Sequence, residues 1–457
     1  MQPVVSIILT SYNKPSTVAK AIDSVLKQTL EEWELFIMDD ASNNETIRII
    51  ESFLNDERIH FYNSQVEDRN RHKTTRYATL INSAIPKTKG KYLSYLTDDT
   101  VYLPNRLKVM VNELERNPAI DVVYSGQKVL RVDNQLKVIS ESNRMPKGVL
   151  RSAANIVDHC SVMHTSRIAE KVFQGFGDYW DDHPKFWHNG DAAFWTRLNE
   201  FTLFYPINEV LDFSYKTPHS FQTLNVYLPE IIPEGTLVKG YSPDIYLIEN
   251  QTRRQIKGDL VQRLNYETSN IIHVPDPILF KYQEGTQIDE SIFHKSSLFP
   301  NGRLVKANNN TSKFYYIQDR QKRLILDHEA MEKYNFTILK AIELSIDFLN
   351  QFAEGPSIDS LLSKETLLPD RMVFNDSYRY FLSQGNHLHP IDQNILKKLK
   401  IPEQQSVQIT KEERLLFSEG KPFNWTYFRQ EKKRKRKNIS SFGKSVFLNR
   451  KGGRGRK

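Results

Sequence analysis

The chain has 457 residues, of which 39% are hydrophobic and 11% aromatic, and its formal net charge is +8. This length exceeds one ordinary hydrophobic core of about 100 to 200 residues, and the composition excludes a chain that is mainly disordered. Residues 429–457 hold thirteen Lys and Arg and one acidic residue, so residues 1–428 carry a net charge of −4, which excludes a strongly basic body.

The first 220 residues alternate strand-like and helix-like segments, as an α/β domain does. Apolar, β-rich runs predict strands at residues 4–10, 35–38, 60–62 and 92–96. Helical patterns between them predict helices at residues 18–26, 45–54 and 77–84, and a further helix near Leu103. The first apolar run is six residues long without a basic stretch before it, so neither a signal peptide nor a membrane span is expected.

Two of these strands end in acidic pairs, and the first pair is Asp39 and Asp40. Ligands gather at the carboxyl ends of parallel strands. A carboxylate at Asp40 could accept a hydrogen bond from the imide N–H of uracil or thymine, a donor that cytosine lacks. Capping of the helix near Glu45 is the alternative, which stays open for Asp39 and is less favoured for Asp40.

The second pair, Asp98 and Asp99, follows Thr97 at the end of the fourth strand. Two adjacent carboxylates after an apolar strand repel each other unless a positive charge compensates them. A hard divalent cation supplies that charge, and it neutralises a departing diphosphate. The pair therefore predicts a metal site, and capping of the helix near Leu103 is the alternative.

A polar cluster follows at Asp158, His159 and His164, which suits an acceptor pocket. Cys160 adds a thiol, but neighbouring side chains on a strand point to opposite faces, so a metal centre is not expected there. Aromatic residues then gather before and after Asp191, where they could pack on sugar rings or form ordinary core. These aromatic residues are Tyr179, Trp180, Phe186, Trp187 and Trp195.

Asp191 lies between Gly190 and an apolar helix at residues 192–198. An inverting sugar transfer needs one carboxylate that takes the proton of the acceptor hydroxyl as its oxygen attacks the anomeric carbon. Asp191 suits that role. A carboxylate at a helix N-terminus is also explained by capping and by the helix dipole, and both readings stay open on the residues alone.

The second half of the chain repeats itself. Stretches beginning at Pro233 and Pro300 share the same order of apolar and basic residues, and a weaker copy begins at Pro369. Each copy predicts a pair of short strands, a helix such as residues 327–334, and an extended closing segment. We expect three tandem α+β repeats, at about 229–288, 296–358 and 365–428, after a first domain at residues 1–228. Their role is expected to be binding, scaffolding or pairing of chains.

Taken together, residues 8–14, 34–40, 73–78, 97–99, 158–164 and 190–191 resemble family 2 glycosyltransferases of the GT-A fold, and in detail those of spore-coat polysaccharide synthesis. The similarity covers slightly under half of the chain. It implies a nucleotide-sugar-binding domain with a mixed central sheet. The remainder would be the α+β repeat region and a basic, disordered tail at residues 429–457.

The resemblance also assigns roles. It implies that Tyr12 stacks on the base, that Asp99 coordinates Mn²⁺ or Mg²⁺, and that Asp191 is the general base. Asp158 and His159 would line the acceptor pocket. Arg71 would approach the base or the diphosphate, with Arg69 and Arg76 as rivals. The full set of expected nucleotide contacts is Thr10, Tyr12, Lys14, Asp40, Arg71 and Asp98.

The function expected from this resemblance is an inverting, metal-dependent transfer of a sugar from a UDP- or dTDP-activated donor to a hydroxyl of a glycan or polysaccharide acceptor. Synthesis of spore-coat or surface polysaccharide is the expected context. The main alternative is a non-enzymatic spore-surface scaffold with a vestigial transferase domain. A sugar nucleotidyltransferase is disfavoured because residues 10–14 contain no glycine for a phosphate loop.

Partners and location follow from charge and cysteine content. The single Cys160 cannot form a disulfide within the chain, which fits a reducing compartment, so we expect a cytoplasmic protein with an association with the spore coat as the alternative. The basic tail is expected to be solvated, with attraction to anionic polymers as its functional reading. No specific nucleic-acid partner is expected, and pairing of chains through the repeats stays open.

Overall fold

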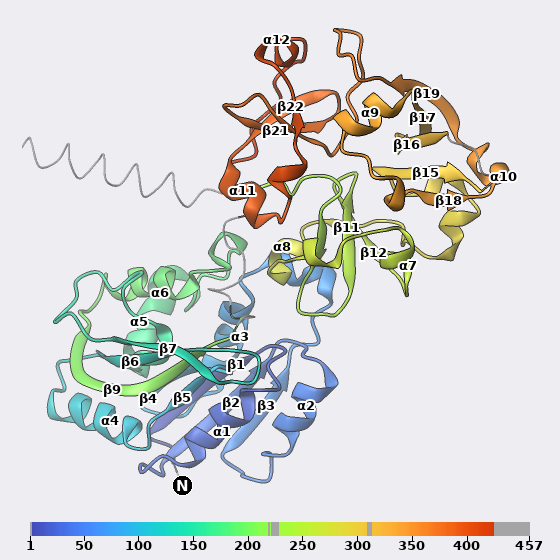
Figure 1. Cartoon of the computed structure of the whole chain (residues 1–457). Coiled ribbons are helices and arrows are strands. Elements are labelled where there is room, and N and C mark those ends of the chain that lie inside the picture. The colour runs from blue at the N-terminus through green and yellow to red at the C-terminus, as the bar shows by residue number, and fades with distance from the viewer. Residues whose placement is uncertain (1, 218–219, 221–227, 309–312, 425–457) are drawn as a thin grey trace, which may run out of the picture. The chain divides into compact units, whose positions relative to one another are not determined.

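The computed structural model describes residues 2–217, 220, 228–308 and 313–424 (Figure 1). Two compact units are formed, one from Met1–Leu224 with Pro275–Lys281 and the other from Asn225–Val274 with Tyr282–Lys457. No helix among the described residues combines the length and the apolar character that crossing a membrane requires. The predicted basic tail, residues 429–457, lies outside the described residues, and the predicted domain boundaries at 228 and 428 stay predictions.

The first unit is built on one sheet. Its strands are β1 (Val5–Ser11), β2 (Trp33–Asp39), β3 (Ile59–Asn63), β4 (Tyr92–Thr97), β5 (Thr100–Tyr102), β6 (Val122–Val132), β7 (Val138–Arg144), β8 (Val162–Thr165) and β9 (Tyr205–Lys216). The strand order is β3-β2-β1-β4-β8-β6-β9-β5, and β7 pairs with β6. Strands β1 to β4 run parallel, whereas β8 is antiparallel to both β4 and β6. The predicted α/β fold with a mixed central sheet is confirmed.

Most helices of this unit lie between its strands in the chain, and α8 comes from the separate segment Pro275–Lys281. They are α1 (Val18–Leu26), α2 (Asn44–Glu51), α3 (Arg76–Ala84), α4 (Arg106–Arg116), α5 (Ser166–Phe176), α6 (Gly190–Leu198) and α8 (Asp276–Leu279). Short 3-10 turns are η1 (Asp68–Lys73), η2 (Ile85–Lys87), η3 (His159–Ser161) and η4 (Pro184–Phe186). Each strand and helix predicted up to residue 96 is present, with ends that differ by a few residues.

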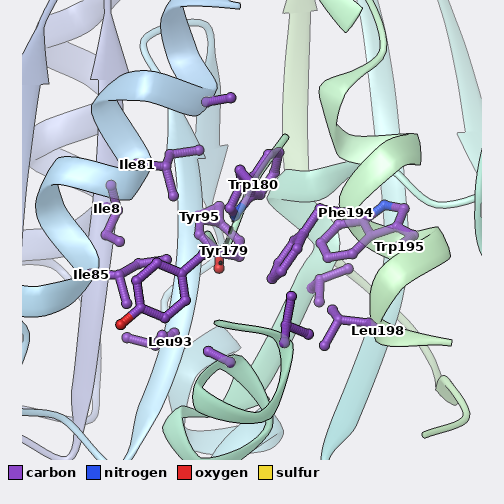
Figure 2. Packing of buried hydrophobic residues seen from close by; sticks show 14 of the residues in the cluster. Ile8, Ile81, Ile85, Leu93, Tyr95, Tyr179, Trp180, Phe194, Trp195 and Leu198 are labelled. Atoms are coloured by element: carbon purple, nitrogen blue, oxygen red, sulfur yellow. Dashed lines mark hydrogen bonds between the residues drawn. The ribbon is translucent and has the colours of Figure 1, made fainter. Parts of the chain in front are cut away.

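Two hydrophobic cores lie on the two faces of this sheet because successive side chains of a strand point to opposite sides. Ile7 and Leu9 of β1 belong to the core formed with α1 and α4, whereas Ile8 belongs to the core formed with α3, α5 and α6. Figure 2 shows the second core, in which Trp180 and Trp195 are fully buried. The aromatic residues on either side of Asp191 therefore supply core at these two positions.

Two capping alternatives are wrong. Helix α2 is capped by Asn43, whose side chain accepts from Thr46 N, and Asp39 instead accepts from Ser42 N at 2.8 Å. The helix expected near Leu103 begins at Arg106, because the short strand β5 intervenes and pairs with β9. Asp98 and Asp99 thus lie in the turn between β4 and β5, away from any helix start.

The second unit contains three sheets of closely related topology. The first has β10 (Leu237–Lys239), β11 (Ile245–Glu249), β12 (Thr252–Ile256), β13 (Ile272–His273) and β14 (Gln283–Glu284). The second has β15 (Arg303–Ala307), β16 (Phe314–Gln318), β17 (Gln321–Ile325), β18 (Ile342–Leu344) and β19 (Ala353–Ile358). The third has β20 (Val373–Asn375), β21 (Tyr380–Gln384), β22 (His387–Ile391) and β23 (Val407–Gln408).

In each sheet three antiparallel strands form the centre, and a short strand pairs in parallel with the first of them, as in the order β13-β10-β11-β12-β14. The predicted pairs of strands are the hairpins β11–β12, β16–β17 and β21–β22. Short helices follow the hairpins at α7 (Leu260–Arg263), α9 (His328–Lys333) and α11 (Gln393–Lys398). Helices α10 (Ile346–Leu349) and α12 (Lys411–Arg414) complete the unit.

Candidate functional site

Asp40 follows β2 and is enclosed by two arginines. Its Oδ2 accepts from Arg71 Nη1 at 2.8 Å, and its Oδ1 accepts from Arg76 Nη2 at 2.6 Å. Arg71 also donates to the backbone carbonyl of Asp40 at 2.7 Å, and its side chain is buried. Arg71 and its rival Arg76 therefore both contact the same carboxylate, whereas the other rival, Arg69, lies on the surface paired with Glu67.

Tyr12 lies beside this cluster, directly after β1. The Arg71 guanidinium lies over one face of its ring, 4.1 Å from the centroid. The Tyr12 hydroxyl donates to Asp276, which belongs to a segment of the same compact unit. Burial and the Asp276 carboxylate both raise the pKa of the Tyr12 phenol, so it stays protonated as a donor. Arg71 therefore covers one face of the aromatic ring that is expected to stack on the base.

Asp98 and Asp99 lie at the carboxyl end of β4 beside the end of β1. Asp98 Oδ2 accepts from the backbone N–H of Tyr12 at 2.8 Å, and the backbone N–H of Asp98 donates to Thr10 O at 3.3 Å. Thr97 Oγ1 donates to Asp99 Oδ1 at 2.8 Å. Neighbouring strands thus hold Thr10, Tyr12 and both carboxylates together, as their places in the sequence predicted.

The two carboxylates differ in their charged neighbours. Burial raises the pKa of Asp98 to about 7, opposed by the positive charge of Lys14 and reinforced by Asp99. Burial acts on Asp99 in the same direction, but Lys216 and Lys14 outweigh it and lower the pKa of that carboxyl. Lys216 Nζ lies 3.9 Å from Asp99 Oδ2. Near neutral pH this pair therefore holds between one and two negative charges.

These groups suit a hard divalent cation. Mg²⁺ and Mn²⁺ prefer carboxylate oxygens, and Asp99 is kept ionised while Asp98 is poised to ionise when a further positive charge arrives. The sequence predicted that a metal ion alone compensates the two carboxylates, whereas in the structure Lys14 and Lys216 already compensate part of their negative charge. Asp98 and Asp99 are the residues that would hold the ion.

Asp158, His159 and Cys160 do not lie on a strand, so the geometric argument against convergence is wrong. The 3-10 turn η3 contains His159 and Cys160, and Asp158 caps it by accepting from Cys160 N at 3.1 Å. One ligand atom from each of the three lies within 4.8 Å of the others. A tight turn brings neighbouring side chains to one side, which an extended strand does not.

His159 connects this turn to Asp191. Its Nδ1 lies 3.9 Å from Asp191 Oδ2, and its ring is parallel to that of Tyr77 at 6.1 Å. Burial would lower the pKa of His159, but Cys160, Asp191 and Asp158 outweigh it and raise that pKa well above 6.5. The protonated imidazole therefore lies between two carboxylates.

Asp191 occupies the first turn of α6, where its Oδ1 accepts from Ala192 N at 2.8 Å. The Tyr77 hydroxyl accepts from Gly190 N and fixes the start of the helix. The Asp191 side chain is 28% exposed, which leaves it open to a ligand. The helix-terminus reading and the general-base reading are thus compatible, because one oxygen binds the helix and the other faces His159.

Sequence reasoning missed Lys216, Tyr77 and Asp276. Lys216 ends β9, a strand that the quoted motifs did not reach, and its link to Asp99 depends on the pairing of β5 with β9. Asp276 lies within residues 229–288, which the sequence analysis assigned to the first repeat, whereas the structure places residues 275–281 in the first unit. Tyr77 lies within residues 73–78, one of the stretches that carry the family resemblance. Its hydroxyl, next to Arg76 in the sequence, could have marked it as a candidate site residue.

Similarity to known proteins agrees with this geometry. A family model described as Glycosyl transferase family 2 matches residues 6–173. The chain is 42% identical over 426 residues to Protein CgeD of Bacillus subtilis (strain 168), covering 93% of this chain and 96% of that protein. It is 30% identical over 267 residues to the uncharacterized glycosyltransferase RP339 of Rickettsia prowazekii (strain Madrid E), covering 58% of this chain and 78% of that one.

A third relative has a stated reaction. The UDP-Glc:alpha-D-GlcNAc-diphosphoundecaprenol beta-1,3-glucosyltransferase WfgD of Escherichia coli is 28% identical over 128 residues, which are 28% of this chain and 47% of WfgD. The matched family region contains β1 to β4 and the two acidic pairs that follow β2 and β4. The chain belongs to the family 2 glycosyltransferases, as its motifs predicted.

Proposed function

We propose that this chain transfers a sugar from a UDP- or dTDP-linked donor to a hydroxyl of a glycan acceptor, with inversion at the anomeric carbon. The observation that carries the proposal is the meeting of three groups at the carboxyl edge of one sheet. These are the Asp40–Arg71–Arg76 cluster, the Asp98–Asp99 pair with its lysines, and the His159–Asp191 pair.

The donor assignment rests on the charges around Asp40. A uracil or thymine imide N–H would donate to this carboxylate, and the diphosphate would lie toward Lys14 and the two acidic residues after β4. Arg71 orients Asp40 by donating to both its carboxylate and its backbone carbonyl, which the forked guanidinium allows and a lysine ammonium does less well. The name of WfgD states UDP-glucose as its donor, which favours UDP over dTDP.

Asp98 and Asp99 would hold Mn²⁺ or Mg²⁺, and the bound ion would neutralise the charge that the leaving diphosphate accumulates. Lys14 and Lys216 supply part of the same positive field. Thr97 orients Asp99 by donating to its Oδ1, so the carboxylate is presented in one rotamer. A preorganised cluster of this kind lowers the barrier more than one that must rearrange.

Asp191 is proposed as the general base. Its Oδ2 takes the proton from the acceptor hydroxyl. At the same time the acceptor oxygen bonds to the anomeric carbon, and the bond between this carbon and the phosphate oxygen breaks. The nucleoside diphosphate departs on the opposite face. The His159 ring, whose pKa is raised, places a positive charge beside the Asp191 carboxylate. General-base catalysis of this type contributes about 10²- to 10⁴-fold.

The acceptor would lie along Asp158 and His159. Asp158 contacts Arg144, so this side of the site presents charges of both signs to a hydroxyl-rich chain. We propose a surface polysaccharide as the acceptor, with the spore coat as one context. The proposal for the spore coat depends on the sequence resemblance described above.

Calorimetric titration tests the donor part directly. UDP and dTDP are titrated into the full chain with and without Mn²⁺, and the titrations are repeated on Asp99→Asn. A matched control is Asp121→Asn, which removes a buried carboxylate that contacts Arg167 and Thr165 before β6, at the other edge of the sheet. Metal-dependent binding lost in Asp99→Asn and kept in the control supports the proposal.

The opposite result decides for the alternative. If neither nucleotide binds at about 1 mM, a concentration that detects even weak ligands, the transferase reading fails and a scaffold with a vestigial domain takes its place. Binding that needs no Mn²⁺ and survives in Asp99→Asn would keep the donor assignment and reject the metal, leaving Lys14 and Lys216 as the compensating charges.

A further inference from the structure

The three sheets of the second unit close into a ring. A residue with positive φ follows each of the short helices α7, α9 and α11, and its side chain donates to a backbone carbonyl of another sheet's segment. The three contacts are Asn265 to Lys340 O at 3.2 Å, Asn335 to Gln405 O at 3.2 Å, and Lys400 to Ile271 O at 2.8 Å. Because the third contact returns to the first segment, the three sheets surround a common axis.

Arg371 breaks the near-equivalence of the three segments. At the matching turn the first two segments carry Gly235 and Gly302, with φ of +83° and +74°, and the third carries Arg371 at +69°. A Cβ at either glycine would lie 2.6 or 2.8 Å from Cδ of Arg371, so the arginine fills the space that both glycines leave. A bulky residue with positive φ is unfavourable, and such strain gathers at ligand-binding sites.

A cavity of about 310 Å³ lies where these turns meet. Its volume is at the lower end of the range of small-molecule sites, which is about 300 to 1,000 Å³. Two of its lining residues have buried polar atoms without a hydrogen-bond partner among the described residues, namely the Tyr266 hydroxyl and Arg303 Nε. Tyr266 is 8% exposed, and an unpaired hydroxyl at such depth is costly unless a ligand or water satisfies it.

Cations outnumber carboxylates among the residues that line the cavity. Four cations and two carboxylates line it, the cations being Arg303, Lys340, Arg371 and Lys400. Lys340 pairs with Glu267 and Arg371 with Glu249, whereas within the described residues Arg303 and Lys400 have no carboxylate at ion-pair distance. Burial raises the pKa of the Tyr266 phenol. Three nearby arginines oppose this rise, and one glutamate adds to it.

We propose that this cavity binds a phosphorylated or carboxylated monosaccharide, with the anionic group facing Arg303 and Lys400 and a hydrogen bond to the Tyr266 hydroxyl. Side chains of Thr337 and Gln405 also line the cavity and offer both donors and acceptors to sugar hydroxyls. This site lies entirely within the second unit, and its function does not require the transferase reading of the first.

Calorimetric titration of the full chain tests the proposal with four probes: inorganic phosphate, glucose 6-phosphate, glucuronate and glucose. We expect glucose 6-phosphate or glucuronate to bind with a Kd at or below about 1 mM and glucose to bind at least about tenfold more weakly. Preference for inorganic phosphate and glucose 6-phosphate identifies a phosphate site, and preference for glucuronate identifies a carboxylate site.

Two variants locate the binding. Tyr266→Phe keeps the ring under Arg303 and removes only the unpaired hydroxyl, so the melting temperature without ligand should not fall, while Kd rises about fivefold, the weight of one hydrogen bond. Lys400→Met should raise Kd about tenfold, because a charge-assisted contact is roughly twice as strong. Lys398→Met, an exposed lysine of α11 outside the cavity, is the control and should bind as the parent does.

Three results would overturn the proposal. They are the absence of saturable binding of either anionic sugar up to about 20 mM, equal binding of glucose, and parental affinity in both Tyr266→Phe and Lys400→Met. The last result would move the bound anion to another part of the chain, such as the nucleotide site. A fall in the melting temperature of Tyr266→Phe without ligand would show that the hydroxyl is satisfied within the protein.

Discussion

Both units bury charged side chains, but the carboxylates compared below differ in how completely positive charges compensate them. In the first unit Asp98 and Asp99 lie side by side with only partial compensation, and burial raises the pKa of Asp98 to about 7. In the second unit Glu249 is 2% exposed and is held by both Arg254 and Arg371, which outweigh its burial and lower its pKa. The Asp98–Asp99 pair can therefore accept a further positive charge, whereas Glu249 is fully compensated and serves as a structural connection.

The largest effect should come from the first unit. Asp191→Asn keeps an oxygen for the Ala192 N–H, so α6 should begin as before, but the amide cannot take a proton. We expect kcat to fall about 10²- to 10⁴-fold, the usual contribution of a general base. Steady-state kinetics with a UDP-sugar measures this loss.

The nucleotide affinity of Asp191→Asn serves as the control. The Kd for UDP with Mn²⁺ should stay near the parental value, because Asp191 is proposed to act on the acceptor. A parallel loss of UDP affinity would place Asp191 in the nucleotide site and reject its role as base.

Replacing a buried carboxylate of the second unit should lower the stability of that unit and leave nucleotide binding unchanged. Glu249→Gln leaves Arg254 and Arg371 buried without their negative partner, which should destabilise the unit by about 3 to 5 kcal/mol. Differential scanning calorimetry measures the loss as a lower melting transition, and UDP affinity should be unchanged.

Glu290→Gln is the matched control for Glu249→Gln. Glu290 also pairs with an arginine, Arg263, but its side chain is 66% exposed. A solvated pair of this kind contributes little to stability, so this variant should lose much less than Glu249→Gln. If the two variants lose equal stability, burial does not distinguish the Glu249 connection and the contrast between the units fails.

Much of the first unit could be predicted because local patterns determine it. The unbroken apolar run at Ile7, Ile8 and Leu9 specifies a strand buried on both faces, and parallel pairing then brings Asp40 and Asp98 to one edge. These expectations required only neighbours in the chain and the rule that parallel strands share an edge.

The remainder depended on contacts between distant segments. Both arginines at Asp40 come from residues more than thirty positions away, and Lys216 reaches Asp99 only because β9 pairs with β5. The convergence of Asp158, His159 and Cys160 was missed because these residues were assigned to an extended strand, whereas they form a capped 3-10 turn. In the second unit, flanking strands of two residues such as β13 leave no periodic pattern to detect.

Asp98 offers a test with pH. Its carboxyl ionises near 3.8 in the unfolded chain and near 7 when folded, so ionisation above pH 3.8 favours the unfolded state and stability falls until about pH 7. Asp98→Asn removes this loss. In the absence of metal we expect its melting temperature to exceed the parental value at pH 7 by at least about 2 to 4 °C, the equivalent of 1 kcal/mol in a domain of this size.

The same comparison at pH 4 is the control for Asp98→Asn. The parental carboxyl is then mostly protonated in the folded state, so the melting temperatures of the two proteins should differ less than at pH 7. Mn²⁺ with UDP should reverse the order at pH 7, because only the parental carboxylate gains a partner. Equal melting curves at every pH would show that Asp98 is already compensated and would remove the main contrast with Glu249.

The smallest effect should come from Thr97, which orients Asp99 and has no charge of its own. Thr97→Val removes the hydroxyl that donates to Asp99 Oδ1, and the Kd for UDP with Mn²⁺ should rise about fivefold, the value of a single hydrogen bond. Thr88→Val removes a hydroxyl that donates to Ile85 O at 2.7 Å and should leave this Kd unchanged. If Thr97→Val also leaves it unchanged, the lysines and Ser220 hold Asp99 ready for the ligand without Thr97, and the carboxylate is as well paired before binding as Glu249 is in the second unit.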